Sequence, residues 1–114
     1  VEGSNILIMG LTFKENCPDL RNTKVVDLVT KLRNEKANVD CYDPWVDVSE
    51  AEQEYRIKCI SSPEIDKYDA IVLTVAHTVF KEMGVSKIRS FGKKKSLIYD
   101  LKYIFPSEFI DLRL

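Results

Sequence analysis

The sequence predicts an α/β domain of three layers, in which helices cover both faces of a mostly parallel β-sheet. Three observations lead to this fold class. Several short runs are almost entirely apolar, which is typical of strands that are buried on both faces. Amphipathic segments with helical spacing alternate with these runs. The length of 114 residues is the usual size of a single domain.

The first half of the chain predicts a strand, a helix and a second strand. The apolar run 5–10 ends at a glycine and predicts a buried strand. Apolar residues then recur at helical spacing over 25–32, and Thr23 is suited to cap the start of this helix. Residues 38–42 predict the second strand, which ends before Pro44 because proline stops both a ladder and a helix.

The second half continues the alternation of strands and helices. Its expected elements are a helix capped by Ser49 and ending at Tyr55, an edge strand 57–60, a strand 70–75, helices 78–83 and 86–91, and a last strand 96–99. The run 70–75 is the strongest strand signal in the chain. We find no internal repeat, so residues 1–114 are expected to form one doubly wound, Rossmann-like unit.

Charge and composition exclude several function classes. The chain has 17 basic and 18 acidic residues, whereas proteins that track nucleic-acid phosphates carry a basic excess. No apolar run approaches the roughly 18 residues that suggest a membrane span. Cys17, Cys41 and Cys59 are odd in number and widely spaced, and His77 is the single histidine, so neither a disulfide framework nor a metal site is expected. Free thiols fit a reducing cytoplasm.

Ligands of open α/β sheets bind beyond the carboxyl ends of the strands, and this rule selects four loops. The first, residues 10–21, lacks the GxGxxG fingerprint of dinucleotide-binding folds. It carries Lys14, which suits a diphosphate, and Arg21, which suits ribose or phosphate oxygens. Surface ion pairs of these two cations with Glu15 and Asp19 are an equally good interpretation of the pattern.

Two further loops carry an acid and the histidine. Asp43 stands where dinucleotide-binding folds hold a ribose hydroxyl, but a turn-forming Asp-Pro with Trp45 packed over the sheet edge is the favoured interpretation. His77 follows a strand and has the chemistry of a general base. Because no acid or nucleophile partner is visible in the sequence, a helix cap or a loop hydrogen bond is favoured for it.

The fourth loop follows the last strand and carries Lys102, which could close with Lys14 on an anionic ligand. Taken alone, Lys102 is expected on the surface. Cys17 lies near Lys14 and Arg21 in the sequence, and such cations would lower the pKa of its thiol. We favour a small loop residue over a nucleophile at this position. From the residues alone, the chain is a binding domain without catalytic machinery.

The same loops resemble those of a known family. Residues 10–23 resemble the signature that opens the C-terminal domain of the UDP-glucose/GDP-mannose dehydrogenases. Residues 42–44 are similar to the Tyr-Asp-Pro that follows the second strand of that domain, and residues 69–73 resemble its apolar strand. Asp100 and Lys102 resemble the acid and the basic residue after its final strand. The resemblance covers essentially the whole chain.

The Cys-Pro-Asp at residues 17–19 is similar to the branch of the family that oxidises UDP-N-acetylhexosamines. The commoner family pattern has threonine at the position of Cys17 and serine at the position of Thr23. This departure favours UDP-N-acetylglucosamine, or its galacto epimer, over UDP-glucose as the substrate.

The resemblance implies that residues 1–114 are the UDP-binding C-terminal domain of a larger enzyme, without its N-terminal NAD domain and central helix. That enzyme would oxidise the sugar C6 alcohol to a carboxylate with two NAD, bound mainly by the missing domain. A cysteine upstream of the matching segment would trap the aldehyde as a thiohemiacetal. The parent is expected to be a cytoplasmic homo-oligomer of polysaccharide biosynthesis, and this chain alone is expected to be inactive.

The resemblance also assigns roles residue by residue. Phe13 and Lys14 would contact the UDP-sugar, with Lys14 on the diphosphate, and Arg21 would reach NAD. Lys102 takes the place of a family arginine that contacts substrate, and Cys17 does not match the catalytic cysteine. Two alternatives remain, a non-catalytic nucleotide-binding or assembly domain and the UDP-glucose or GDP-mannose branch. A phosphate-receiver domain is disfavoured because the first strand ends without acids.

Overall fold

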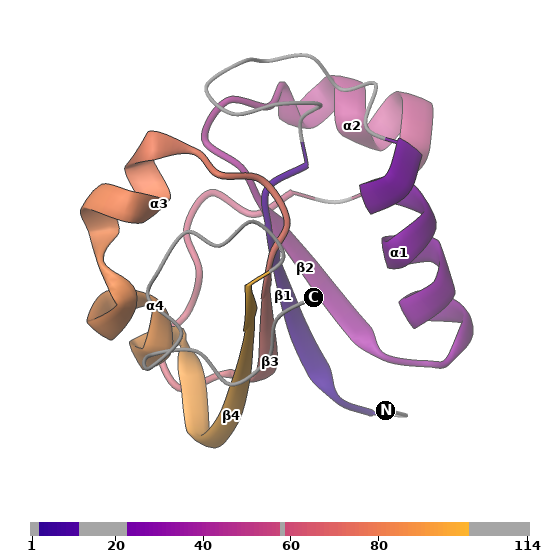
Figure 1. Cartoon of the computed structure of the whole chain (residues 1–114). Coiled ribbons are helices and arrows are strands. Elements are labelled where there is room, and N and C mark those ends of the chain that lie inside the picture. Colours follow the sequence, from indigo (N-terminus) through magenta and orange to yellow (C-terminus); the bar gives the residue numbers. More distant parts are fainter. Residues whose placement is uncertain (1–2, 12–22, 58, 101–114) are drawn as a thin grey trace.

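The computed structural model describes residues 3–11, 23–57 and 59–100, and its elements alternate as the sequence predicts (Figure 1). In chain order they are β1 (Asn5–Met9), α1 (Thr23–Asn34), β2 (Asn38–Tyr42), α2 (Val48–Tyr55), β3 (Tyr68–Leu73), α3 (Thr78–Met83), α4 (Val85–Phe91) and β4 (Gly92–Asp100). None of the described helices is long and apolar enough to cross a membrane.

The described strands form one sheet in the order β2-β1-β3-β4, and every neighbouring pair is parallel. Ile8 of β1 stands opposite Cys41 of β2 on one side and Val72 of β3 on the other. In chain order, β2 is added on one side of β1, and β3 and then β4 are added on its other side. This reversal of strand order places a topological switch point at the carboxyl ends of β1 and β3, where doubly wound folds bind ligands.

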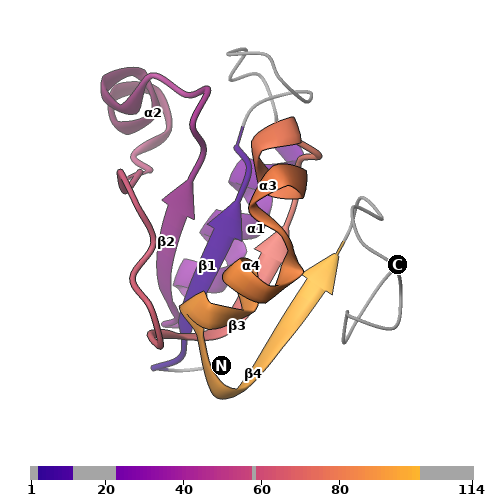
Figure 2. The same cartoon turned by 90° about the vertical axis from the view of Figure 1, so that its left-hand side faces the viewer.

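Helices cover both faces of the sheet, which confirms the predicted three layers. α1 and α2 lie on one side, and α3 and α4 lie on the other (Figures 1 and 2). Alternate residues of β1 point into the two layers of the core, as the pleat requires. Ile6 and Ile8 pack in the layer of α1, with Val25, Val29, Cys41, Ala51, Ile57 and Cys59 among its members. Leu7 and Met9 pack in the layer of α3 and α4, with Tyr68, Ile71, Leu73, Phe80, Ile88, Phe91 and Ile98.

Two predicted details are wrong. Among the described residues of 57–60, an isolated parallel bridge of Cys59 to Cys41 and a hydrogen bond from the N–H of Ile60 to the carbonyl oxygen of Cys41 take the place of the predicted edge strand. Ser49 does not cap α2, since the helix begins one residue earlier, at Val48. Asp47 takes the cap instead, and its side chain accepts a hydrogen bond from the N–H of Glu50 at 3.1 Å. This is the geometry of an N-cap acid bonded to the third helical residue.

The boundaries of the last two strands also differ from the prediction. β3 ends at Leu73 rather than at residue 75, and β4 begins at Gly92 rather than at residue 96. The pairing of β4 with β3 is irregular at its start, between Tyr68 and Ala70, and becomes regular from Leu97 onward. α1 begins at Thr23, but the side chain of Thr23 lies outside the described part of the chain, so its role as a cap stays a prediction.

Candidate functional site

The carboxyl ends of all four strands lie at one edge of the sheet, because the strands are parallel (Figure 2). The residues that follow the strands there are Gly10 and Leu11 after β1, Asp43 after β2 and Thr74 after β3, while Asp100 ends β4. Parallel α/β folds bind their ligands beyond this edge. We therefore take it as the candidate site and describe how its residues are held.

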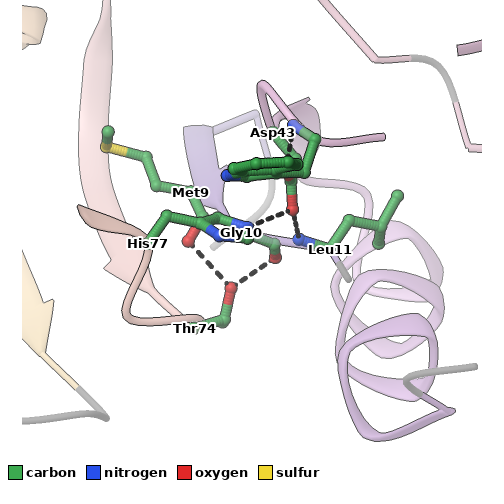
Figure 3. Close-up of polar contacts among 7 residues, drawn as sticks. Met9, Gly10, Leu11, Asp43, Thr74 and His77 are labelled. Atoms are coloured by element: carbon green, nitrogen blue, oxygen red, sulfur yellow. Dashed lines mark hydrogen bonds and ion pairs between the residues drawn. The ribbon is translucent and has the colours of Figure 1, made fainter. Parts of the chain in front are cut away.

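Asp43 is the centre of the hydrogen bonds at this edge (Figure 3). Its Oδ2 accepts from the N–H of Leu11 at 2.7 Å and lies 2.9 Å from Nε2 of His77. Its Oδ1 accepts from the N–H of Trp45 at 2.8 Å. The three donors come from the loops after three different strands. One carboxylate thus ties together the loops that follow β1, β2 and β3.

The pKa of Asp43 reflects a balance of opposed effects. Burial by itself would raise it, because a charged carboxylate loses its hydration. The hydrogen bonds from His77, Leu11 and Trp45 outweigh burial and hold the pKa below its ordinary value. Asp43 is therefore ionised near neutral pH. Since an ionised carboxylate only accepts hydrogen bonds, Nε2 of His77 carries the hydrogen of their contact.

His77 is enclosed by aromatic rings as well as by Asp43. The ring of Phe80 meets the imidazole edge-on, with centroids 5.3 Å apart, and the indole of Trp45 lies 6.5 Å away. The side chains of His77 and Asp43 are both 0% exposed, whereas Trp45 is 43% exposed. A general base must reach the proton that it removes. His77 does not reach solvent in this structure, so it is not placed as a general base.

The end of β1 is also fixed from the side of β3. The N–H of Thr74 donates to the carbonyl oxygen of Met9 at 3.0 Å, and its hydroxyl donates to the carbonyl oxygens of Met9 and Gly10. Gly10 has a φ of 111°, and an added Cβ would lie 2.7 Å from Cβ of Val75. Only glycine permits both this conformation and this close approach. Gly10 therefore serves the packing of β1 against the end of β3.

Sequence reasoning missed the contact between Asp43 and His77. The prediction that Asp43 forms a turn is confirmed by its bond to the N–H of Trp45. The sequence does not show an acid partner for His77, and the structure provides one in Asp43. This contact confirms the favoured interpretation of His77 as the donor or acceptor of a loop hydrogen bond, whereas its side chain makes no capping bond at the start of α3. Both residues follow strands that flank β1, so the strand order, had it been known, would have brought them together.

The residues predicted to bind ligand lie outside the described residues. These are Phe13, Lys14 and Arg21, in the segment between Leu11 and α1, and Lys102, two residues after the end of β4. The described chain ends at Leu11 before the first segment and at Asp100 before the second. Both segments are therefore joined to the carboxyl edge of the sheet. Among the described residues, no group of three His, Cys, Asp or Glu could hold a metal ion.

Comparison with known proteins gives one consistent family. Residues 7–107 match the model of the UDP-glucose/GDP-mannose dehydrogenase family, UDP binding domain. Two relatives called UDP-N-acetyl-D-glucosamine 6-dehydrogenase, from Salmonella typhi and Pseudomonas aeruginosa, are each 52% identical over 114 residues, which is all of this chain. The matched region is 27% of each relative, so the chain spans about a quarter of their length.

Solved structures give the same result at the level of the fold. A UDP-D-ManNAc dehydrogenase from Pyrococcus horikoshii is 27% identical and has a TM-score of 0.71 over 92% of this chain and 23% of its own. A UDP-glucose dehydrogenase from Pyrobaculum islandicum has a TM-score of 0.75 over 99% of this chain and 25% of its own, at 17% identity, and shows the fold alone. The family model, the relatives and the solved structures agree, and the chain belongs to the UDP-glucose/GDP-mannose dehydrogenase family as its UDP binding domain.

Proposed function

We propose that this chain binds the UDP-sugar substrate of an NAD-dependent dehydrogenase that oxidises C6 of a UDP-N-acetylhexosamine to the uronic acid. The domain would act as part of a longer enzyme, whose other parts bind most of NAD and supply the nucleophile. The overall change is the four-electron oxidation of a primary alcohol, with water as the source of the second carboxylate oxygen. Two NAD accept the two hydrides.

The proposal rests on the sequence identities of this chain to two groups of relatives. The two UDP-N-acetyl-D-glucosamine 6-dehydrogenases are 52% identical to the whole chain. Relatives called UDP-glucose 6-dehydrogenase, from Rhizobium meliloti and Rickettsia prowazekii, are 28% and 30% identical over 95% of it. The difference favours an N-acetylhexosamine substrate, in agreement with the Cys-Pro-Asp at residues 17–19.

The carboxyl edge supports the assignment of ligand roles to the adjoining segments. Lys14 follows Leu11 by three residues, and Lys102 follows Asp100 by two, so both start from the edge where α/β folds bind ligands. We assign Phe13 and Lys14 to the UDP-sugar, with Lys14 on the diphosphate, and Lys102 as a second cation for the same ligand. Ammonium groups suit phosphate oxygens through charge-assisted hydrogen bonds, each worth about 1.5–3 kcal/mol.

The described turn after β1 differs from a dinucleotide-binding turn. A dinucleotide turn uses glycines to bring the backbone close to a pyrophosphate, whereas the missing side chain of Gly10 makes room for Val75. This observation supports NAD binding mainly outside this chain, with Arg21 as the one residue here that we assign to it. We further propose a cytoplasmic homo-oligomeric enzyme whose product serves polysaccharide biosynthesis, with neither nucleic acid nor membrane as a partner.

The test is an absorbance assay for NADH with the full-length dehydrogenase. It compares UDP-N-acetylglucosamine, UDP-N-acetylgalactosamine, UDP-glucose and GDP-mannose. We expect two NADH per UDP-N-acetylhexosamine and a lower kcat/KM with the other two substrates. Preference for UDP-glucose or GDP-mannose would contradict the assigned branch, and no turnover by a folded protein would contradict the function itself.

Lys14→Ala tests the role of this lysine in the same assay. Loss of one charge-assisted contact of about 1.5–3 kcal/mol predicts a kcat/KM lower by roughly tenfold to a hundredfold. Lys31→Ala removes an exposed lysine of α1 and serves as the matched control. Equal kcat/KM values for the two variants would contradict the assignment of Lys14 to the diphosphate.

A further inference from the structure

We propose that Asp43 and His77 are positioning residues for substrate binding. They would fix the point at which the chain leaves β1 and thereby raise the affinity for the UDP-sugar through Phe13 and Lys14, without touching the ligand. The inference rests on the proposed function, because it takes Phe13 and Lys14 as ligand-binding residues. It gives two buried side chains, which do not touch the ligand, a role in substrate affinity.

The contact that carries the inference is the hydrogen bond from the N–H of Leu11 to Oδ2 of Asp43, 2.7 Å long. Leu11 is the last described residue before the segment 12–22, and it is 1% exposed. Phe13 and Lys14 follow it by two and three residues. A change in the direction of the backbone at Leu11 would therefore move both. Displacements on the order of 1 Å at a binding group are enough to change function strongly.

His77 holds Asp43 in the position that this contact requires. Its Nε2 lies 2.9 Å from the same Oδ2 that accepts from Leu11. The imidazole is itself held edge-on against Phe80. Figure 3 shows Asp43 between His77 and the N–H of Leu11, with Thr74 bonded to the carbonyl oxygens of Met9 and Gly10. The end of β1 is thus held by residues that follow both of its neighbouring strands.

Neither side chain is open to a ligand from solvent in this structure. Their side chains are 0% exposed, and both oxygens of Asp43 already accept from N–H groups. A bare carboxylate next to a diphosphate would repel it. Three donors around Asp43 offset that charge while keeping the carboxylate in place. We therefore expect Asp43 to act on affinity through the loops that it holds.

Asp47 offers a matched control on the same loop. Its Oδ1 accepts one hydrogen bond from the backbone N–H of Glu50, within α2. It is exposed and caps a helix, and its side chain bonds within its own segment, to the N–H of Glu50. Asp47→Ala therefore removes an acid and a hydrogen bond from a backbone N–H while leaving the end of β1 as it is.

The experiment measures KM and kcat of the full-length dehydrogenase for the UDP-sugar. Asp43→Asn replaces one accepting carboxylate oxygen by an NH2 group, which cannot accept a hydrogen bond from an N–H. We expect it to raise KM about tenfold, which is about 1.4 kcal/mol, with kcat changed less than about twofold and the KM for NAD unchanged. Asp47→Ala should leave all three values at the wild-type level. An Asp43→Asn variant whose KM for UDP-sugar equals that of wild type would overturn the inference.

Variants of His77 test the same inference if the Asp43→Asn variant does not fold. His77→Gln retains an N–H donor, and His77→Leu fills the space without one. We expect the glutamine variant to restore most of the affinity that the leucine variant loses. Equal KM values for the two, or a loss confined to kcat, would contradict the positioning role and leave these residues a purely structural one.

A second readout separates this inference from the proposed function. The dissociation constant of UDP from the 114-residue chain can be compared between wild type and Asp43→Asn by NMR. If the full enzyme used none of the nucleotide sugars, the proposed substrate would be wrong, and this comparison would still decide the positioning role. A weaker affinity in the variant alone supports it, and equal affinities overturn it.

Discussion

Asp43 and His77 follow the two strands that flank β1, and their side chains meet across its end, with Oδ2 2.9 Å from Nε2. Neither side chain reaches solvent. A buried carboxylate of this kind is stable only when donors replace its lost hydration, and here Leu11, Trp45 and His77 provide them. Removing the carboxylate would therefore leave buried N–H groups without an acceptor, and its protonation would weaken all three contacts.

Asp43→Ala should lower the free energy of unfolding by about 3 kcal/mol or more, because breaking a buried pair leaves its partners uncompensated. Asp47→Ala, which removes only an exposed helix cap, should cost about 1 kcal/mol. Urea unfolding followed by circular dichroism measures both. Equal losses for the two variants would mean that the carboxylate at the strand ends contributes no more than a surface cap.

The stabilising effect of Asp43 should depend on pH in a defined direction. Burial by itself would raise the pKa of Asp43. The hydrogen bonds from His77, Leu11 and Trp45 have the larger effect and hold the pKa below its ordinary value of 3.8. The unfolded chain therefore takes up the proton first as pH falls. The contribution of Asp43 is fully present above about pH 4 and is lost as pH falls through its folded pKa.

Urea unfolding of wild type and Asp43→Ala between pH 7 and pH 3 measures this effect. The pKa of Asp69 is also lowered, mainly by the N–H of Asn5, so only the difference between the two proteins isolates Asp43. We expect this difference in unfolding free energy to shrink at the acid end. A difference that stays constant or grows there would refute the lowered pKa.

Gly10→Ala should destabilise the chain more than Gly84→Ala. Both glycines have positive φ, 111° and 84°, so both substitutions strain the backbone. Only at Gly10 would the new Cβ collide, with Val75, whereas nothing lies within 4 Å at Gly84. Overpacking typically adds about 1–3 kcal/mol, and thermal and urea unfolding should show this excess. Comparable losses would indicate that β1 and β3 separate easily at their ends.

Cys41 and Cys59 should resist thiol reagents in the folded chain. Burial raises the pKa of Cys41 to about 12 and that of Cys59 to about 11, so thiolate is scarce at pH 8. In a Cys17→Ser variant, which retains only these two thiols, we expect a disulfide reagent to react slowly until urea unfolds the protein. Rapid labelling of either cysteine under native conditions would be inconsistent with their burial in the core.

The sequence predicted most of the architecture because β1 and β3 are apolar on both faces and alternate with amphipathic helices. Such patterns are local, and so are turns such as Asp43-Pro44. The contact of Asp43 with His77 is not local: it depends on β1 lying between β2 and β3. The missed cap at Asp47 has a smaller cause, since two neighbouring polar residues were both suited to start α2.

The most direct test of the account is an NMR titration of the 114-residue chain with UDP. We expect weak binding, with a dissociation constant of about 1 mM, which corresponds to about 4 kcal/mol. Amide shifts should change at the carboxyl edge, including Leu11 and Thr74, and stay constant at the opposite edge, at Asn5 and Asn38. No shift up to roughly ten times that concentration, or shifts confined to the opposite edge, would contradict UDP binding at the ends of these strands.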